Sequence, residues 1–438
     1  MRRRVAALVM AGAMAMSLLG AGNVYAADDN GASVEYAPDD TKGEITIYCY
    51  YGESSKVYAD YAVEKMEELH PDLKINIEPR TDSDGTALKT WAAVGELPDI
   101  FQVVNQDLYD TLRDNGDLYQ FDSIVDETNY YDNIKNGDKY KENFTDEDGH
   151  QYSVGSEITA TYEVFYNISL LKELGLECPT NYDEFKNCVK VLKENGKIPV
   201  ALAGNEQWFT MGLYDMAVIA EGAYEGTSAI SKGDSKFADN EAYTKAADKI
   251  QELIDMGAFG SSPTSTTSSQ AVELMSSGQA GFTLAGTWQF DVANLGGYAD
   301  NCGWVKNNIF ADAGKEDEIS KHRQGGAYPH YYLSANANPT SGLDADTVGE
   351  LAMEFNYYYC EAPGTTGTLT TVGDFEVKGS DAYMEYADSR DSFETFTDFT
   401  YAFANTDFVS QEGNALDMML TGNSSAEDFI KTMEDAGF

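Results

Sequence analysis

The chain has 438 residues, of which 29 are basic and 74 are acidic, so its net charge is −45. Such an acidic chain lacks the basic face that nucleic-acid phosphates require, and anionic membrane surfaces would repel it. A further constraint comes from the five cysteines. Their spacing is irregular and forms no Cys-x-x-Cys pair, so we expect free buried thiols and no structural zinc site.

The first 26 residues have the pattern of a secretory signal peptide. Arg2, Arg3 and Arg4 precede an apolar run of roughly 15 residues, shorter than the ~20 that a spanning helix needs, and small residues end at Ala26. Residues 18–23 resemble a lipoprotein lipobox, but Ala21 replaces the cysteine that would carry the lipid. We therefore predict export without a lipid anchor. Cleavage near Ala26 and a replaced natural cysteine both remain open, and an uncleaved anchor is the alternative reading.

Residues 27–42 are polar and acidic and are predicted to form a linker. From residue 43 onward, strands alternate with helices: strands are expected over 44–50, 73–78 and 98–104, with helices over 57–69 and 86–94. This alternation predicts a parallel sheet in an α/β lobe.

The second half of the chain continues with both kinds of element. We expect strands over 164–167 and 280–285, and helices over 169–175, 182–195, 345–360 and from 426, with much of 208–275 helical. The strand over 280–285 stops at Gly286 and presents Trp288 on the following loop. A strand end that delivers an indole to a loop is typical of a ligand cleft in an α/β protein.

No motif predicts a metal or a cofactor. Asp82-Ser83-Asp84-Gly85 resembles the start of a calcium loop, but Ala93 stands where the bidentate glutamate would be. The four histidines are scattered, and no glycine-rich phosphate loop occurs.

Five short segments carry a family resemblance. They are Gly95 to Phe101, Gly149 to Tyr152, Phe165 to Asn167, Pro179 to Phe185 and Gly278 to Trp288. In this order the chain resembles the extracellular solute-binding proteins of ABC importers, in the large family whose members bind sugars. The resemblance covers nearly the whole chain from residue 43, and the missing lipobox cysteine is its main departure.

This resemblance implies an α/β fold of the periplasmic-binding-protein type, with two lobes and a ligand cleft between them. Lobe I would hold residues 43–157 with a return segment at about 325–360, and lobe II would hold 158–324 and 361–438. The protein would be a monomer and not an enzyme. It would capture its ligand by hinge closure and deliver it to the permease.

Aromatic residues are the first candidates for a sugar site, because the C–H face of a sugar packs flat on an aromatic ring. Trp288 matches the tryptophan that stacks on sugar in the family, and Trp208 precedes a helix where relatives also place stacking aromatics. Tyr162 and Tyr328 would face the cleft near the two crossings between the lobes. The alternative for each is a core or groove-filling role, which we expect for Trp91 and Trp304.

Polar candidates follow the strands of lobe I. Tyr51 and Glu53 follow the strand over 44–50, and Asn105 and Asp107 follow the strand over 98–104. Ligands bind at the carboxyl ends of parallel strands, where these side chains would contact sugar hydroxyls. Capping of helix N-termini is the alternative.

The predicted function is therefore binding of a neutral mono- or oligosaccharide. The scarcity of basic residues disfavours an anionic ligand. A secreted glycoside hydrolase is one alternative, although no carboxylate pair stands out among 74 acids. A binding protein for a non-sugar solute is the other. The sugar, its linkage and its length are left undefined.

Overall fold

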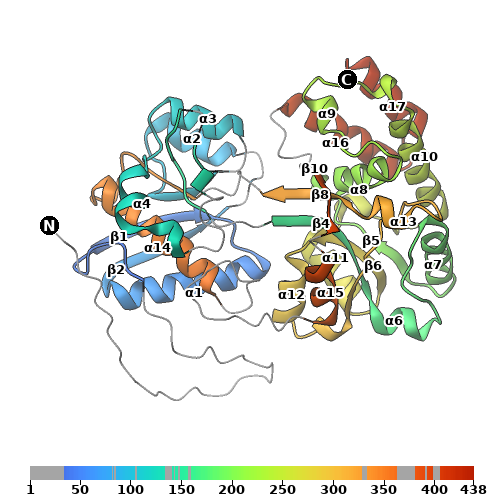
Figure 1. The fold of residues 1–438 in the computed structure, drawn as a ribbon, viewed down its shortest axis with the longest axis horizontal. Coiled ribbons are helices and arrows are strands. Elements are labelled where there is room, and N and C mark those ends of the chain that lie inside the picture. Colours follow the sequence, from blue (N-terminus) through green and yellow to red (C-terminus); the bar gives the residue numbers. More distant parts are fainter. Residues whose placement is uncertain are drawn as a thin grey trace. The chain divides into compact units, whose positions relative to one another are not determined.

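The computed structural model describes residues 34–80, 82, 85–103, 106–133, 141–142, 144–146, 148–155, 159–327, 333–362, 380–389, 392–397 and 405–438. The predicted signal peptide lies outside these residues. The chain divides into two compact units (Figure 1). Unit 1 comprises residues 1–157 and 329–378, and unit 2 comprises residues 158–328 and 379–438.

Unit 1 is built on a four-stranded sheet in the order β2-β1-β3-β9. β1 pairs in parallel with β2 and β3, whereas β9 runs antiparallel to β3. The expected parallel α/β arrangement is therefore confirmed, and β9 is an addition that the sequence pattern did not indicate. The strands are β1 Lys42–Cys49, β2 Asp72–Pro79, β3 Ile100–Gln102 and β9 Leu333–Ala335.

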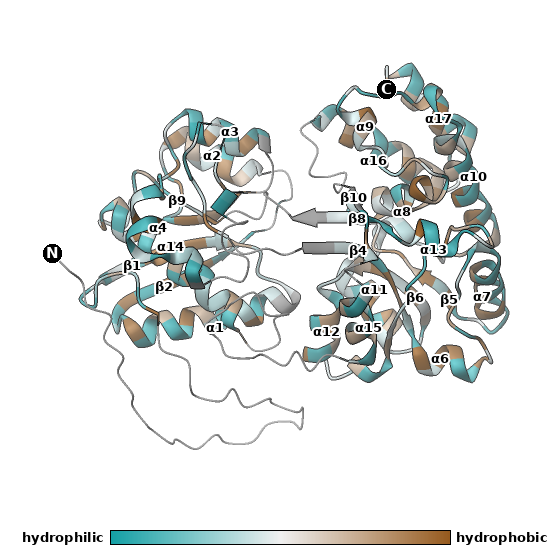
Figure 2. Cartoon of the chain, viewed as in Figure 1, coloured by the Kyte–Doolittle hydropathy of each residue, from teal (hydrophilic) through white to brown (hydrophobic). Residues whose placement is uncertain are grey.

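The helices of unit 1 cover this sheet with their apolar faces. α1 and α14 lie side by side, and Tyr58 of α1 packs edge-on against Tyr359 of α14 with ring centroids 5.5 Å apart. Figure 2 shows hydrophilic and hydrophobic residues together along α1, as expected for a helix with one buried face. The helices are α1 Glu53–Leu69, α2 Thr86–Val94, α3 Gln106–Asp114, α4 Asp122–Thr128, α14 Ala345–Glu361 and the 3₁₀ helix η1 Tyr130–Asn133.

The segment from residue 34 to 41 differs from the expected linker because it packs on unit 1. Tyr36 and Ala37 are buried, and both of their backbone N–H groups donate to Oε1 of Glu354 at 2.7 Å. The other carboxylate oxygen of Glu354 lies 2.9 Å from Nε2 of His70. A buried carboxylate needs such partners, so Glu354 holds this segment on α14. Residues 27–33 of the predicted linker lie outside the described part.

Unit 2 is built on a six-stranded mixed sheet. The main order is β10-β8-β4-β6-β5, and β7 also pairs with β4. β5 and β6 are parallel, and β4 runs antiparallel to β6, β7 and β8. The strands are β4 Thr159–Asn167, β5 Ile198–Ala201, β6 Ala280–Gly286, β7 Cys302–Trp304, β8 His322–Ala327 and β10 Thr395–Thr397.

Helices surround this sheet, and α8, α10, α16 and α17 form a contiguous group (Figure 1). Of these, α8 is buried from Phe209 to Ala220, so it lies in the core of the unit. The helices are α6 Ile168–Glu173, α7 Tyr182–Glu194, α8 Gln207–Ala220, α9 Ser228–Ser231, α10 Glu241–Met256, α11 Ser268–Ser276, α12 Gln289–Leu295, α13 Glu316–Ile319, α15 Asp381–Ser389, α16 Thr406–Leu420 and α17 Ala426–Asp435, with the 3₁₀ helices η2 Phe237–Asp239, η3 Pro263–Ser265 and η4 Ala299–Asn301.

Two expected segment boundaries shift. The return segment was expected from about residue 325, but Gly325 and Gly326 belong to β8, where they pair with Thr161 and Ala160 of β4. The second boundary was expected at 360–361, but α14 continues in unit 1 to Glu361 and the division falls at 378–379. Strand pairing, which is non-local, decides the first of these boundaries.

All five cysteines lie in the described part of the chain as free thiols, and all are buried except Cys178, which is half-buried. Burial raises the pKa of the Cys49, Cys178 and Cys302 thiols to about 12 and that of Cys188 to about 11. These thiols are therefore protonated and unreactive at neutral pH. Within the described residues, no helix has both the length and the apolar character needed to cross a membrane.

One acidic side chain in the core of unit 2 has an unusual environment. Glu412 of α16 is fully buried close to the carboxylate of Asp215, which lies on α8. The hydroxyl of Thr227 donates to Asp215 at 2.9 Å, and it also lies within hydrogen-bonding reach of Glu412, where it acts to lower the pKa of that carboxyl. Burial, and then the charge of Asp215, raise the pKa of Glu412 well above its ordinary value of 4.5.

We therefore expect Glu412 to make stability fall as the pH rises. Because the folded-state pKa lies above the unfolded one, the contribution is fully present below pH 4.5 and is lost as the pH rises through the folded pKa. Glu412→Gln should remove a slope of about 1.4 kcal/mol per pH unit in this window. Urea unfolding at pH 4 and pH 7 checks this, and an equal effect of the substitution at both values would contradict it.

Candidate functional site

One edge of the unit 2 sheet gathers three of the predicted aromatic residues. β5 and β6 are parallel, so the loops after their carboxyl ends lie at the same edge. The loop after β5 leads to Trp208 in the first turn of α8, and the loop after β6 carries Trp288. In the antiparallel pairing of β4 with β6, Tyr162 is opposite Gly286, which places it at this edge too.

Trp208 and Trp288 form a tilted indole pair. Their ring centroids are 5.7 Å apart and their planes are inclined by 56°. Both side chains are half-buried, so part of each large apolar ring surface is exposed to water. Such a pair offers apolar ring surface next to solvent, which is what a sugar needs for stacking.

The structure places Tyr162 differently from the expectation. Its side chain is only 1% exposed, and its hydroxyl donates to the backbone carbonyl of Phe209 at 2.7 Å. The ring packs edge-on against Trp208, with centroids 5.8 Å apart. The strand register directs the Tyr162 side chain into the core of unit 2. There it packs against Trp208 and presents no surface to a ligand.

Two neighbours of Trp208 were not singled out in the sequence. Phe209 packs on the indole with a centroid separation of 3.7 Å. Glu206, which precedes α8, accepts the indole N–H at 3.4 Å and the backbone N–H of Ser268 at the same distance. This half-buried carboxylate lies at the edge of the indole pair, where a polar acceptor suits a sugar hydroxyl. The signal in the sequence that could have identified Glu206 is its position two residues before Trp208.

A buried ion pair joins β4 to β8. Nη1 of Arg323 contacts Oε2 of Glu163 at 3.2 Å, and both side chains are at most 5% exposed. Glu163 also accepts the Trp304 indole N–H at 2.9 Å and the Thr161 hydroxyl at 2.7 Å. The expected core position of Trp304 is confirmed. These contacts fix β4, the strand that carries Tyr162.

Three of the predicted residues of unit 1 follow the carboxyl ends of β1 and β3. Tyr51 follows β1, Glu53 begins α1, and Asp107 is an exposed residue in the first turn of α3. A carboxylate in the first turn of a helix is stabilised by the helix dipole, which gives Asp107 a structural role within α3. The side chain of Glu53 and all of Asn105 and Tyr328 lie outside the described part.

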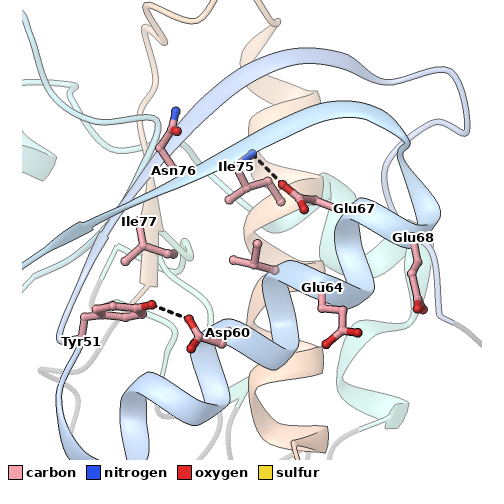
Figure 3. Close-up of a pocket in the computed structure, with 9 residues that line it drawn as sticks. Tyr51, Asp60, Glu64, Glu67, Glu68, Ile75, Asn76 and Ile77 are labelled. Atoms are coloured by element: carbon pink, nitrogen blue, oxygen red, sulfur yellow. Dashed lines mark hydrogen bonds between the residues drawn. The ribbon is translucent and has the colours of Figure 1, made fainter. Parts of the chain in front are cut away.

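Tyr51 lines a groove of about 740 Å³ between α1 and β2. Its hydroxyl donates a hydrogen bond to Asp60 (Figure 3). It also accepts a hydrogen bond from Lys56 at 3.0 Å. Beyond Tyr51, the groove is lined by the acidic residues Asp60, Glu64, Glu67 and Glu68, by the apolar residues Val63, Ile75 and Ile77, and by Asn76. The Tyr51 hydroxyl is thus used within unit 1, and the Lys56 ammonium also lies over its half-buried ring, 4.6 Å from the ring centroid.

The remaining predictions concern Trp91 and metals. Trp91 packs edge-on against Tyr48, with centroids 5.0 Å apart, beside the core of unit 1. Asp82 accepts the Tyr48 hydroxyl at 2.6 Å and the Ala87 backbone N–H at 2.7 Å, so it organises the start of α2. Among the described residues, no group of three or more potential ligands is arranged to hold a metal ion.

Comparison with known proteins defines the family. Residues 52–339 match the model of the bacterial extracellular solute-binding proteins, which covers most of the chain. The chain therefore belongs to this family, as the five ordered segments suggested. Membership of an extracellular family also implies export.

Individual relatives are distant. A multiple sugar-binding protein of Streptococcus mutans is 26% identical over 211 residues, which are 47% of this chain and about half of that relative's length (46%). A solved structure from a study of xylan utilization by Caldanaerobius polysaccharolyticus has a TM-score of 0.74 at 20% identity and covers 90% of this chain and 99% of that one. A chitin oligosaccharide binding protein has a TM-score of 0.73 at 18% identity, covering 91% and 98%. These structures show the shared two-lobed solute-binding-protein fold.

Proposed function

We propose that this protein is the extracytoplasmic binding component of an ABC importer and that it captures a neutral mono- or oligosaccharide. The observation that carries the proposal is the half-buried indole pair of Trp208 and Trp288 at one edge of the unit 2 sheet, beside the carboxylate of Glu206. Ring surface for the C–H face of a sugar and a carboxylate for its hydroxyls are the two components of such a site.

The names of the relatives support the carbohydrate class. One is a multiple sugar-binding protein and another binds chitin oligosaccharides. The chemistry of this chain agrees, because its net charge of −45 disfavours an anionic ligand. Delivery to permease subunits, action as a monomer and hinge closure belong to the same proposal. Binding without catalysis also belongs to it.

A thermal-shift screen of the mature chain tests the proposal. A ligand that binds only the folded state stabilises it by about 2.7 kcal/mol at one hundred times its dissociation constant, and so raises the melting temperature. We expect a shift with at least one neutral oligosaccharide and none with its uronic-acid counterpart. Shifts only with amino acids, peptides or organic acids would contradict the carbohydrate class.

A further inference from the structure

The Trp288 indole packs on the backbone of Gly286, the last residue of β6. A Cβ added at Gly286 would lie 2.0 Å from Cζ3 of the Trp288 indole, 2.2 Å from Cη2 and 2.3 Å from Cε3. Real Cβ atoms essentially never approach another heavy atom within 3.0 Å. No residue with a side chain therefore fits at this position while the indole stays where it is.

The three distances also show how the ring lies. A point approaching the ring edge in the plane would be much nearer to one atom than to its two bonded neighbours. Nearly equal distances to three consecutive atoms place the point over the ring. One face of the Trp288 indole thus lies on the Gly286 backbone, and only the opposite face can take a ligand.

The backbone of Gly286 has little freedom to move away. It pairs with Tyr162 in the β4–β6 ladder, and the next residue, Thr287, donates its N–H to the carbonyl of Thr161 at 3.1 Å. Gly286 does not have a positive φ, so alanine can adopt its backbone conformation. Glycine is therefore required here by the position of the Trp288 indole and not by the backbone conformation of the turn.

We propose that Gly286 is the positioning residue of the indole pair: its lack of a side chain seats Trp288 beside Trp208. Any side chain at Gly286 would displace the Trp288 indole and remove the stacking surface. The effect on ligand binding rests on the proposed carbohydrate function, whereas the position of the indole does not.

The test compares Gly286→Ala, Trp288→Ala and the double variant. The readouts are near-ultraviolet circular dichroism without ligand and affinity for the oligosaccharide that gives the largest thermal shift. We expect Gly286→Ala to change the indole signal and to weaken binding about tenfold or more. In the Trp288→Ala background it should change affinity by less than about twofold, because the clashing ring is gone.

Gly281→Ala is the matched control. Gly281 lies in the same strand on its other face, and a Cβ there would be 2.4 Å from Cδ1 of Leu192 in the core. We expect this variant to lose stability and to keep its affinity and the Trp288 signal. An equal loss of affinity in Gly281→Ala would overturn the proposal, because the effect would then be general destabilisation.

Other outcomes are equally decisive. A wild-type indole signal in Gly286→Ala, or a further loss of affinity in the double variant, would overturn the positioning role. Should Gly286→Ala fail to fold, the double variant is expected to fold, and its failure would count against the proposal. If the wild-type protein bound no sugar, the proposed function would fail, while the ligand-free signal of Gly286→Ala would still decide the role of Gly286.

Discussion

Trp288→Ala is expected to weaken carbohydrate binding by about 1–3 kcal/mol, which is roughly 5- to 150-fold in the dissociation constant. The substitution removes the ring whose outward face would carry the sugar, and it also exposes the Gly286 backbone. Trp208→Ala should have an effect of similar size. Because the two indoles are in contact, with centroids 5.7 Å apart, the losses in the double variant should not add.

Calorimetric titration of the two single variants and of the double variant checks this expectation. Trp91→Phe is the matched control, since Trp91 packs on Tyr48 beside the core of unit 1. It should alter the protein's fluorescence and leave the affinity unchanged. Wild-type affinity in folded Trp288→Ala would exclude Trp288 from the site.

The second large effect concerns stability. Arg323→Met is expected to lower the free energy of unfolding of unit 2 by about 3–5 kcal/mol, because it leaves the Glu163 carboxylate buried without its charge partner. Both side chains of this pair are at most 5% exposed, so solvent cannot take the place of the guanidinium. The Thr161 hydroxyl and the Trp304 indole N–H remain as neutral donors to Glu163.

Urea unfolding followed by tryptophan fluorescence reports on this unit, since Trp208, Trp288 and Trp304 all lie in unit 2. The double variant Glu163→Gln with Arg323→Met removes both charges and should recover much of the loss, because the remaining groups are neutral. A double variant as unstable as Arg323→Met alone would show that packing, and not the charge, is what the arginine contributes.

The strand that carries Trp288 was predictable from local pattern. The run from Ala280 to Ala285 is apolar and ends at a glycine, and the structure has β6 over Ala280–Gly286. α2 was expected over residues 86–94 and has those bounds, with Gly95 ending it at a φ of 71°. Elements with strong local signals and clear ends need no tertiary information.

Other strands had no such signal. β5 is only four residues long and contains Pro199, and it becomes a strand because it pairs with β6 some 80 residues away. β8 has the sequence His-Arg-Gln-Gly-Gly-Ala, which shows no apolar alternation. Its arginine is buried because Glu163 lies opposite on β4. Neither pairing can be read from the residues on one side alone.

The candidate site likewise combines features that the local sequence indicates with features that depend on strand pairing. The sequence indicated that Trp208 and Trp288 were exceptional, but their contact depends on the parallel pairing of β5 with β6. The orientation of Tyr162 could not be predicted, because a shift of one residue in strand register exchanges the two faces of a strand. The dependence of Trp288 on Gly286 likewise appears only once the indole has a position.

The proposed function requires that this protein bind a carbohydrate and leave it unchanged. The decisive experiment is isothermal titration calorimetry of the mature chain, residues 27–438, with the oligosaccharide that the thermal-shift screen selects. The sugar recovered from the calorimeter cell is then analysed by mass spectrometry. We predict saturable heat from a single class of site and recovery of the intact sugar. The absence of saturable heat with every neutral sugar, or the release of monosaccharide in proportion to the protein, would overturn the proposed function.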